Sequence, residues 1–217
     1  MCWHARLLPQ LGETALWARI EAAFAADPDF RNDPPHVEKA RPIALFVCPS
    51  DPRTGRPSEV TKPVNGFNSY QGVLGLDHQT PNGVLFLGSR IGLTDIADGT
   101  SHTLFAGERP PSADERLGWW YAGWGQQHTG SADAVLGVRG LNQPSDPRDR
   151  ECPRGPYHFV PGQFDDQCHA FHFWSPHPGG AHFAFCDGSV RFLGYPADTI
   201  LPALATRSGG ESVSEYE

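Results

Sequence analysis

Four histidines and three further potential metal ligands lie close together near the C-terminal end of the chain: His169, His172, His177 and His182, with Cys168, Cys186 and Asp187. Imidazole nitrogen and thiolate sulfur are ligands that zinc and related transition metals prefer, so this segment is a candidate transition-metal site. The spacing also fits histidines that serve only as surface and hydrogen-bonding groups. We expect His169 and His172 in an extended segment or a loop, where a step of three residues places their side chains on opposite faces.

His177 and Asp187 form a second candidate pair, for acid–base chemistry. A carboxylate near an imidazole orients and polarises it, and together with His182 the pair would be the centre of a metal-dependent hydrolase. Asp187 is also explained as a turn residue, because it precedes Gly188. His177 lies between two prolines, where one hydrogen bond would fix the entry to a hairpin. A structural role is the simpler interpretation of both residues.

Three aspartates in expected loops, Asp95, Asp98 and Asp187, are candidate calcium ligands, with Glu108 as a further oxygen donor. Calcium prefers such hard oxygen ligands. The regular spacing of a calcium-binding loop is missing, however, and the same carboxylates are typical of ordinary turns.

The densest aromatic cluster is formed by Trp119, Trp120, Tyr121 and Trp124. In an extended segment, alternation would place Trp120 and Trp124 on one face and the other two rings on the opposite face. One face would then belong to the core, and an exposed second face could stack on a sugar or on a neighbouring subunit. Buried core and glycan platform both remain open at this point.

The chain has five cysteines and no Cys-x-x-Cys pair: Cys2, Cys48, Cys152, Cys168 and Cys186. A zinc ribbon is therefore not indicated. We favour a disulfide between Cys152 and Cys168, because they bracket a loop rich in proline and glycine, where a crosslink removes much chain entropy.

Composition and motifs exclude several function classes. The net charge of −8 and the lack of a basic cluster argue against nucleic acid as a partner. No Gly-x-Ser-x-Gly, His-Glu-x-x-His or phosphate-binding loop occurs. The usual sequence motifs of common hydrolases and nucleotide-binding proteins are therefore absent. The longest apolar run, Ile43 to Cys48, is far shorter than the ~20 residues that span a bilayer.

The elements that position these side chains follow from periodicity. Apolar residues from Leu8 to Phe24 recur at steps of three and four, which predicts an amphipathic helix ending at Asp27-Pro28. Short strands are expected next, with a long, variable loop insertion over 125–167, where periodicity is lost. The expected strands are Ile43–Val47, Phe67–Val73, Val84–Leu87, Thr103–Gly107, Leu117–Trp124 and Phe171–Trp174.

A β-hairpin around Asp187-Gly188 is the clearest predicted element. A two-residue loop would pair Phe185 with Val190 and Phe183 with Phe192, so that these four side chains share one apolar face. A short helix follows, with Asp198 as its cap and Gly209-Gly210 at its end. The order of elements predicts an α+β fold in a single domain over 1–217: an N-terminal amphipathic helix packed on an antiparallel sheet with long loops, and a short C-terminal helix.

Several segments resemble one family, the prepilin-like proteins defined by a His, nine intervening residues and Asp-Gly near the C-terminus. His177, Asp187 and Gly188 have this spacing, and the sequence from Ser175 to Phe192 is similar to the family signature throughout. Further similar segments are Trp3–Pro9, Phe46–Asp51, Asn68–Tyr70, Thr94–Glu108 and Leu204–Glu211.

The resemblance implies a pseudopilin-like head in an extracytoplasmic compartment, at the cell surface or in a periplasm-like space. Such a head would assemble with other pilin-like subunits or secretion-assembly proteins in a pilus-like or type II secretion-like filament. The family normally carries a prepilin leader and a long apolar helix before the Trp-His segment, whereas this chain begins at Met1-Cys2. We therefore expect a head that lacks its membrane helix. Only that helix would attach the head to a membrane. His102 and His182 also replace the asparagine usual in the family.

Three hypotheses follow from these patterns. The first is a non-enzymatic structural or assembly component. The second is a glycan-binding surface module that uses the Trp119–Trp124 cluster. The third is a metal-dependent hydrolase at His177, His182 and Asp187.

Overall fold

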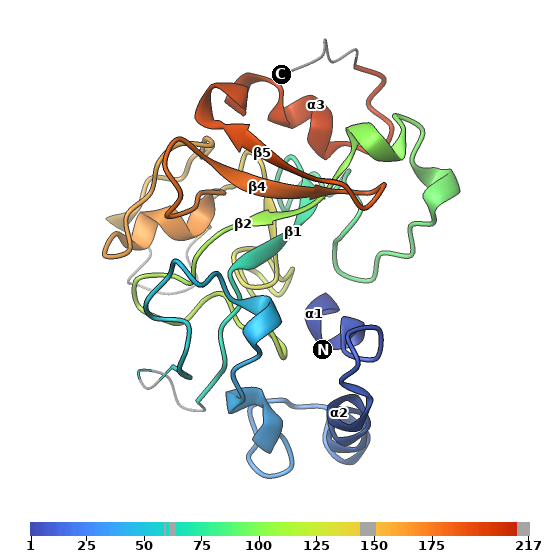
Figure 1. Ribbon diagram of the computed structural model, residues 1–217, viewed down its shortest axis with the longest axis vertical. Coiled ribbons are helices and arrows are strands. Elements are labelled where there is room, and N and C mark those ends of the chain that lie inside the picture. Colours follow the sequence, from blue (N-terminus) through green and yellow to red (C-terminus); the bar gives the residue numbers. More distant parts are fainter. Residues whose placement is uncertain (59, 61–63, 144–150, 212–217) are drawn as a thin grey trace.

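The computed structural model describes residues 1–58, 60, 64–143 and 151–211 and shows an α+β fold around one five-stranded sheet (Figure 1). The helices and strands are α1 (Trp3–Leu7), α2 (Thr14–Ala26), β1 (Tyr70–Gly75), β2 (Leu104–Glu108), β3 (Val135–Gly137), β4 (Gly180–Phe185), β5 (Val190–Gly194) and α3 (Leu201–Ala205). The predicted fold class and short C-terminal helix are thus confirmed. No helix in these ranges is both long and apolar enough to cross a membrane.

The sheet has the order β3-β1-β2-β4-β5 and is antiparallel except at one edge, where β3 runs parallel to β1. The register pairs Tyr70 with Glu108 and Gly107 with Phe183. A Cβ atom on Gly107 would lie 2.4 Å from the Phe183 ring, so only glycine leaves room for this ring beside β2. The C-terminal end of β2 is therefore surrounded by β1 and β4.

The hairpin differs from its prediction by one register step. The loop has three residues, because the Phe185 N–H donates to the Ser189 carbonyl, and Gly188 adopts a φ of +85°. Three-residue hairpin loops commonly end in a glycine of this conformation. Consequently Ala184, not Phe185, pairs with Val190. The one-step shift moves the side chains of β5 to the opposite faces.

The main core lies on one side of the sheet and is covered by α3. Phe183, Phe185 and Leu193 meet Leu201 and Leu204 there, all of them buried. Asp198 does not cap this helix. Its carboxylate binds Arg139 and accepts a hydrogen bond from the Phe159 N–H instead.

A second core holds the N-terminal helices, at the opposite end of the molecule from α3 (Figure 1). The helix predicted to start at Leu8 begins only at Thr14, as α2. Helix α1 precedes the predicted segment, and Pro9 and Gly12, the latter at a φ of +82°, lie in the turn between the two helices. Leu16 and Ile20 of α2 pack in a cluster with Trp120 and Tyr121 rather than on the strands of the sheet.

Several predicted strands are not strands. Ile43–Val47 contains the 3₁₀ helix Ala44–Phe46, and the segment before Trp174 contains the 3₁₀ helix Gln167–Phe171. Neither Val84–Leu87 nor Leu117–Trp124 forms a strand, although Leu85 donates to the Val73 carbonyl alongside β1. Short apolar runs do not distinguish buried loops from strands, which explains these errors.

The segment 125–167 is not separate from the core. It contains β3 and contributes Leu136, Val138 and Phe159 to the main core. Part of it, residues 144–150, lies outside the described ranges. The structure joins Cys152 to Cys168 by a disulfide, the pair favoured from the sequence.

Candidate functional site

Three side chains of different chemistry converge at the C-terminal end of β2. His177 Nε2 lies 3.2 Å from Glu108 Oε1 and 3.6 Å from Cys48 Sγ. One ligand atom from each of the three residues lies within 4.8 Å of the others, and no other such group of three occurs in the part of the chain that the structure describes. We call Cys48, Glu108 and His177 the Cys-Glu-His cluster.

Glu108 is the last residue of β2 and is buried. Its backbone carbonyl accepts a hydrogen bond from the Trp174 N–H, which ties the strand end to the segment before β4. The carboxylate is held from the other side by His182, whose N–H donates to Oε2 at 2.7 Å and whose Nδ1 lies 3.2 Å from the same oxygen. Oε1 is thus left to face His177.

The backbone N–H groups of the other two members of the cluster donate to serine hydroxyls, which hold both residues in place. The Cys48 N–H donates to Ser69 Oγ, just before β1, and the Cys48 side chain is buried. The His177 N–H donates to Ser175 Oγ, and that hydroxyl donates to the Gly180 carbonyl. The cluster therefore joins three segments that are far apart in the sequence.

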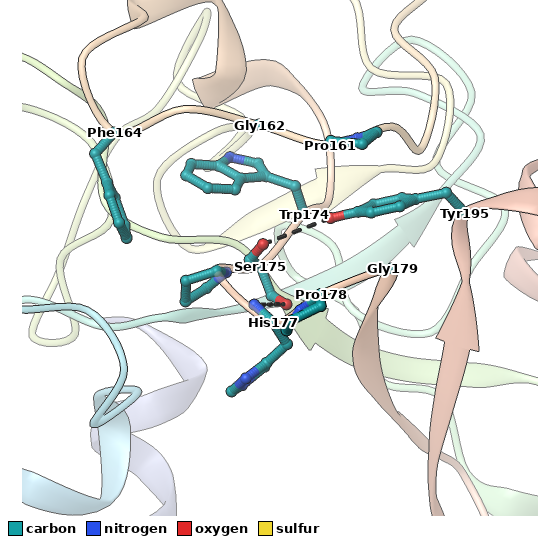
Figure 2. Close-up of a pocket in the computed structure, with 10 residues that line it drawn as sticks. Pro161, Gly162, Phe164, Trp174, Ser175, His177, Pro178, Gly179 and Tyr195 are labelled. Carbon is teal, nitrogen blue, oxygen red and sulfur yellow. Dashed lines mark hydrogen bonds between the residues drawn. The ribbon is translucent and has the colours of Figure 1, made fainter.

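A pocket of about 390 Å³ lies beside the cluster and is lined by Phe164, Trp174 and Tyr195. Figure 2 shows that the His177 ring points away from these aromatic rings, although His177 belongs to the pocket wall. The pocket and the cluster are therefore neighbours, and the imidazole faces Cys48 and Glu108 rather than the pocket.

An apolar groove of about 350 Å³ lies on the other face of the sheet, between α1, the strands and the Ala44–Phe46 helix. Its walls include Trp3, Leu7, Leu45, Phe105, Ala184 and Val190, and they contain no Asp, Glu, Lys or Arg. We call it the sheet groove. The shifted register of the hairpin places Val190 in its wall, with 65% of its surface exposed.

Comparison with known proteins identifies a family. A family model described as "Protein of unknown function (DUF1559)" matches residues 1–199. The chain belongs to the DUF1559 family. No curated protein and no solved structure matches it.

The structure of this DUF1559 protein separates His177 from Asp187, the pair considered for acid–base chemistry. Asp187 lies in the hairpin loop, where its carboxylate accepts from the Ser189 N–H and hydroxyl. These hydrogen bonds lower the pKa of Asp187. Glu108 takes the place beside His177 and His182 that the sequence interpretation gave to Asp187.

The expected calcium ligands also serve local structure in the DUF1559 protein. Asp95 accepts a hydrogen bond from the Gly92 N–H, and Asp98 accepts from the N–H groups of Gly209 and Gly210. Asp95, Asp98 and Asp187 do not form a group of ligand atoms within the described ranges. The calcium hypothesis has no geometric support from them.

The remaining histidines form a separate pair. His169 Nδ1 lies 2.6 Å from His172 Nε2, so the two rings meet, contrary to the expectation of opposite faces. A 3₁₀ helix brings residues three apart onto the same side, and His169 lies in one. Burial lowers the pKa of His172 to about 4. Cys168, the neighbouring candidate metal ligand, forms the disulfide with Cys152.

The aromatic cluster divides differently from the predicted alternation. Trp120 and Tyr121 are both fully buried, and Trp119 is half-buried. Trp124 is 44% exposed, but its ring stacks on His128 and lies under the Arg31 guanidinium. These residues do not form an open row of rings for a sugar.

Cys48 is the member of the cluster that sequence reasoning missed, and Glu108 was considered only for calcium. Cys48 ends the apolar run Ile43 to Cys48, and 129 positions in the sequence separate it from His177. Only the pairing of β2 with β1 and β4 brings the three segments together.

Proposed function

We propose that this chain is the globular head of a prepilin-like surface protein and that it acts by binding other subunits, not by catalysis. Membership of the DUF1559 family supports this proposal, as does the resemblance of the His177-to-Gly188 segment to the prepilin-like signature. The observation that carries it is the sheet groove.

Exposed apolar surface gathers at this groove. Val190 and Leu45 in its walls are 65% and 62% exposed, and Phe192 follows Val190 on the same strand face. Exposed apolar surfaces that gather around a groove often mark sites where a soluble protein binds a partner. Fully burying one such side chain contributes about 1.5–3 kcal/mol. Because Val190 and Leu45 are already partly buried, covering both would contribute about 2–4 kcal/mol to binding.

An apolar helix of a pilin-like subunit is the occupant that we propose. The walls carry no charged carboxylate, ammonium or guanidinium group, so a charged segment would lose its hydration without compensation. An amphipathic or apolar helix laid in a hydrophobic groove needs no such compensation. The long apolar helix implied for prepilin-like subunits has this chemistry.

The disulfide supports an extracytoplasmic location. Disulfides that hold structure persist in oxidising compartments and are rare in the reducing cytosol. The Cys152–Cys168 bond joins the 125–167 segment to the 3₁₀ helix before Trp174, so it has a structural position. We therefore propose that the head lies outside the cytoplasm.

Photo-crosslinking in the native organism tests the proposal. A photoreactive amino acid replaces Val190 in the groove and, as a control, Val37, which is 57% exposed near α2. We expect crosslinks from position 190, but not from position 37, to peptides of the apolar N-terminal helix of a pilin-like subunit, identified by mass spectrometry. Crosslinks only to unrelated proteins, or equal crosslinking at both positions, would contradict the proposal.

A further inference from the structure

We propose that the Cys-Glu-His cluster is a binding site for one Zn²⁺ ion, with Cys48 Sγ, Glu108 Oε1 and His177 Nε2 as ligands. The three proposed ligands lie outside the walls of the sheet groove, although His182, which holds Glu108, belongs to them. The inference goes beyond the subunit-binding function and does not rest on it.

The distances within the cluster fit a tetrahedral zinc site. With Zn–S of about 2.3 Å and Zn–N and Zn–O of about 2.1 Å, tetrahedral angles separate sulfur from nitrogen by about 3.6 Å and nitrogen from oxygen by about 3.4 Å. The observed separations are 3.6 Å between Cys48 Sγ and His177 Nε2 and 3.2 Å between His177 Nε2 and Glu108 Oε1. Two of the three separations are thus close to those that one ion requires, and the ligand atoms of Cys48 and Glu108 lie within 4.8 Å of each other.

Hydrogen bonding alone serves this arrangement poorly. A single ring proton on His177 Nε2 points at either Cys48 Sγ or Glu108 Oε1, although both atoms lie close to it. If the thiol donates to Nε2 instead, the nitrogen lone pair and the carboxylate oxygen face each other without a proton between them. One cation at the common centre attracts all three atoms at once.

The surroundings hold the ligands in place, as in metal sites whose outer partners orient the donors. His182 binds Glu108 Oε2 through its N–H and its ring and leaves Oε1 directed at the cluster. Ser69 fixes the backbone at Cys48, and Ser175 fixes the backbone at His177. Little reorganisation would be needed to bind the ion.

The donor set selects the kind of metal. Thiolate, imidazole and carboxylate together are typical of zinc, whereas calcium and magnesium require oxygen ligands throughout. Three protein ligands leave a fourth position for water. Cys48 and Glu108 are buried and His177 is partly exposed, so an ion would reach the site from the His177 side.

Metal titration of the purified protein tests the site. The protein is freed of metal with a chelator and titrated with zinc chloride by calorimetry, and bound zinc is measured by elemental analysis after desalting. We expect one zinc per chain. In Cys48→Ser, Glu108→Gln and His177→Ala the affinity should fall by more than about 100-fold, and in His182→Ala by about 10- to 100-fold, the usual effect of losing an outer partner.

Matched controls separate the site from general thiol or imidazole binding. Cys186→Ser removes another free cysteine, and His102→Ala removes an exposed histidine that contacts Ser101, so both should bind zinc as the parent protein does. Cobalt(II) provides a second measurement, because thiolate ligation gives a near-ultraviolet charge-transfer band that Cys48→Ser should abolish. Circular dichroism identifies any variant that does not fold. His177→Ala is the decisive variant, because His177 lies in a partly exposed loop. If this variant binds zinc as tightly as the parent does, the zinc-site proposal is wrong. It is also wrong if the parent protein binds no zinc.

Discussion

At the scale of single residues, Arg109 and Asp133 carry buried charge beside the aromatic cluster. Asp133 Oδ1 accepts hydrogen bonds from the N–H groups of Gly118 and Trp119, each at 3.1 Å. Burial raises the pKa of Asp133 to about 6 and lowers that of Arg109 to about 10. Arg109 also donates to the Pro110 and Ala132 carbonyls. The pair therefore fixes loop backbone at a cost in desolvation.

The raised pKa of Asp133 predicts a pH dependence of stability. The folded state keeps this proton up to a pH of about 6, whereas an unfolded chain releases it near the ordinary value of 3.8. Stability is therefore lost as pH rises from about 4 through 6. Asp133→Asn removes the titration, so relative to the parent it should be more stable at pH 7 than at pH 4 by about 2 kcal/mol. Urea unfolding of both proteins at the two pH values measures this difference.

Asp187→Asn is the matched control for this experiment. Hydrogen bonds from Ser189 lower the pKa of Asp187, so its contribution is present above the ordinary pKa and is lost as pH falls. Both pH 4 and pH 7 lie above this ordinary pKa of 3.8, so the relative stability of this variant should change little between them. A change of equal size in both variants would contradict the assignment of the effect to Asp133.

The candidate site could be predicted from the sequence only in part. His177 was identified by its place in a motif, but its partner was sought nearby in the sequence, at Asp187. Glu108 became the partner because β2 and β4 pair in one register. Neither the register nor the position of Cys48 follows from local spacing, since both depend on contacts between distant segments.

At the scale of elements, the hairpin shows how much depends on one loop residue. Asp-Gly is typical of two-residue loops, but the same glycine also fits the last position of a three-residue loop. The structure has the longer loop, and Cys186 and Asp187 are anchored by donating to the carbonyls of Thr103 and Thr100. These two hydrogen bonds to the segment before β2 are not visible in the hairpin's own sequence.

Gly188→Ala tests the role of the positive φ in this loop. An added Cβ would meet no atom within 4 Å, so any loss of stability comes from the backbone conformation at a φ of +85°. We expect a loss of about 1–2 kcal/mol, and a smaller loss in Gly188→Asn, because asparagine tolerates this conformation better. Thermal or urea unfolding measures both values.

Gly55→Ala is the control for Gly188→Ala, because Gly55 also has open space around it but no positive φ. It should be neutral or slightly stabilising, by up to about 1 kcal/mol. Equal losses at both glycines would show that φ is not the cause.

At the scale of the whole molecule, two hydrophobic cores share one chain. The main core joins the sheet to α3, and the second core joins α1 and α2 to Trp120 and Tyr121. Helix α3 lies at the opposite end of the molecule from α1 and α2 (Figure 1). Backbone hydrogen bonds connect the second core to the end of the sheet; for example, the Asn68 N–H donates to the Gly118 carbonyl. Sequence periodicity predicted the N-terminal helix but not this division, because the aromatic residues that complete the second core follow α2 by about a hundred positions.

The division into two cores predicts that the N-terminal helices open more easily than the sheet. Strands β1, β2 and β4 are held by neighbours on both sides, whereas α2 is held mainly by side chains such as Leu16 and Ile20. Ile20→Ala should cost about 2–5 kcal/mol locally, because it leaves a cavity beside the buried aromatic rings.

Native-state hydrogen exchange measures this local effect. Local opening free energies differ between cooperative units of a protein. In Ile20→Ala, amides of α2 should exchange faster by the factor that corresponds to this loss, while amides of β2 and β4 should change far less. Leu193→Ala, in the main core, is the matched variant and should speed exchange in β2 and β4, while amides of α2 change far less, because they open without breaking the main core. If Ile20→Ala accelerates the sheet amides as much as those of α2, the two cores unfold as one unit.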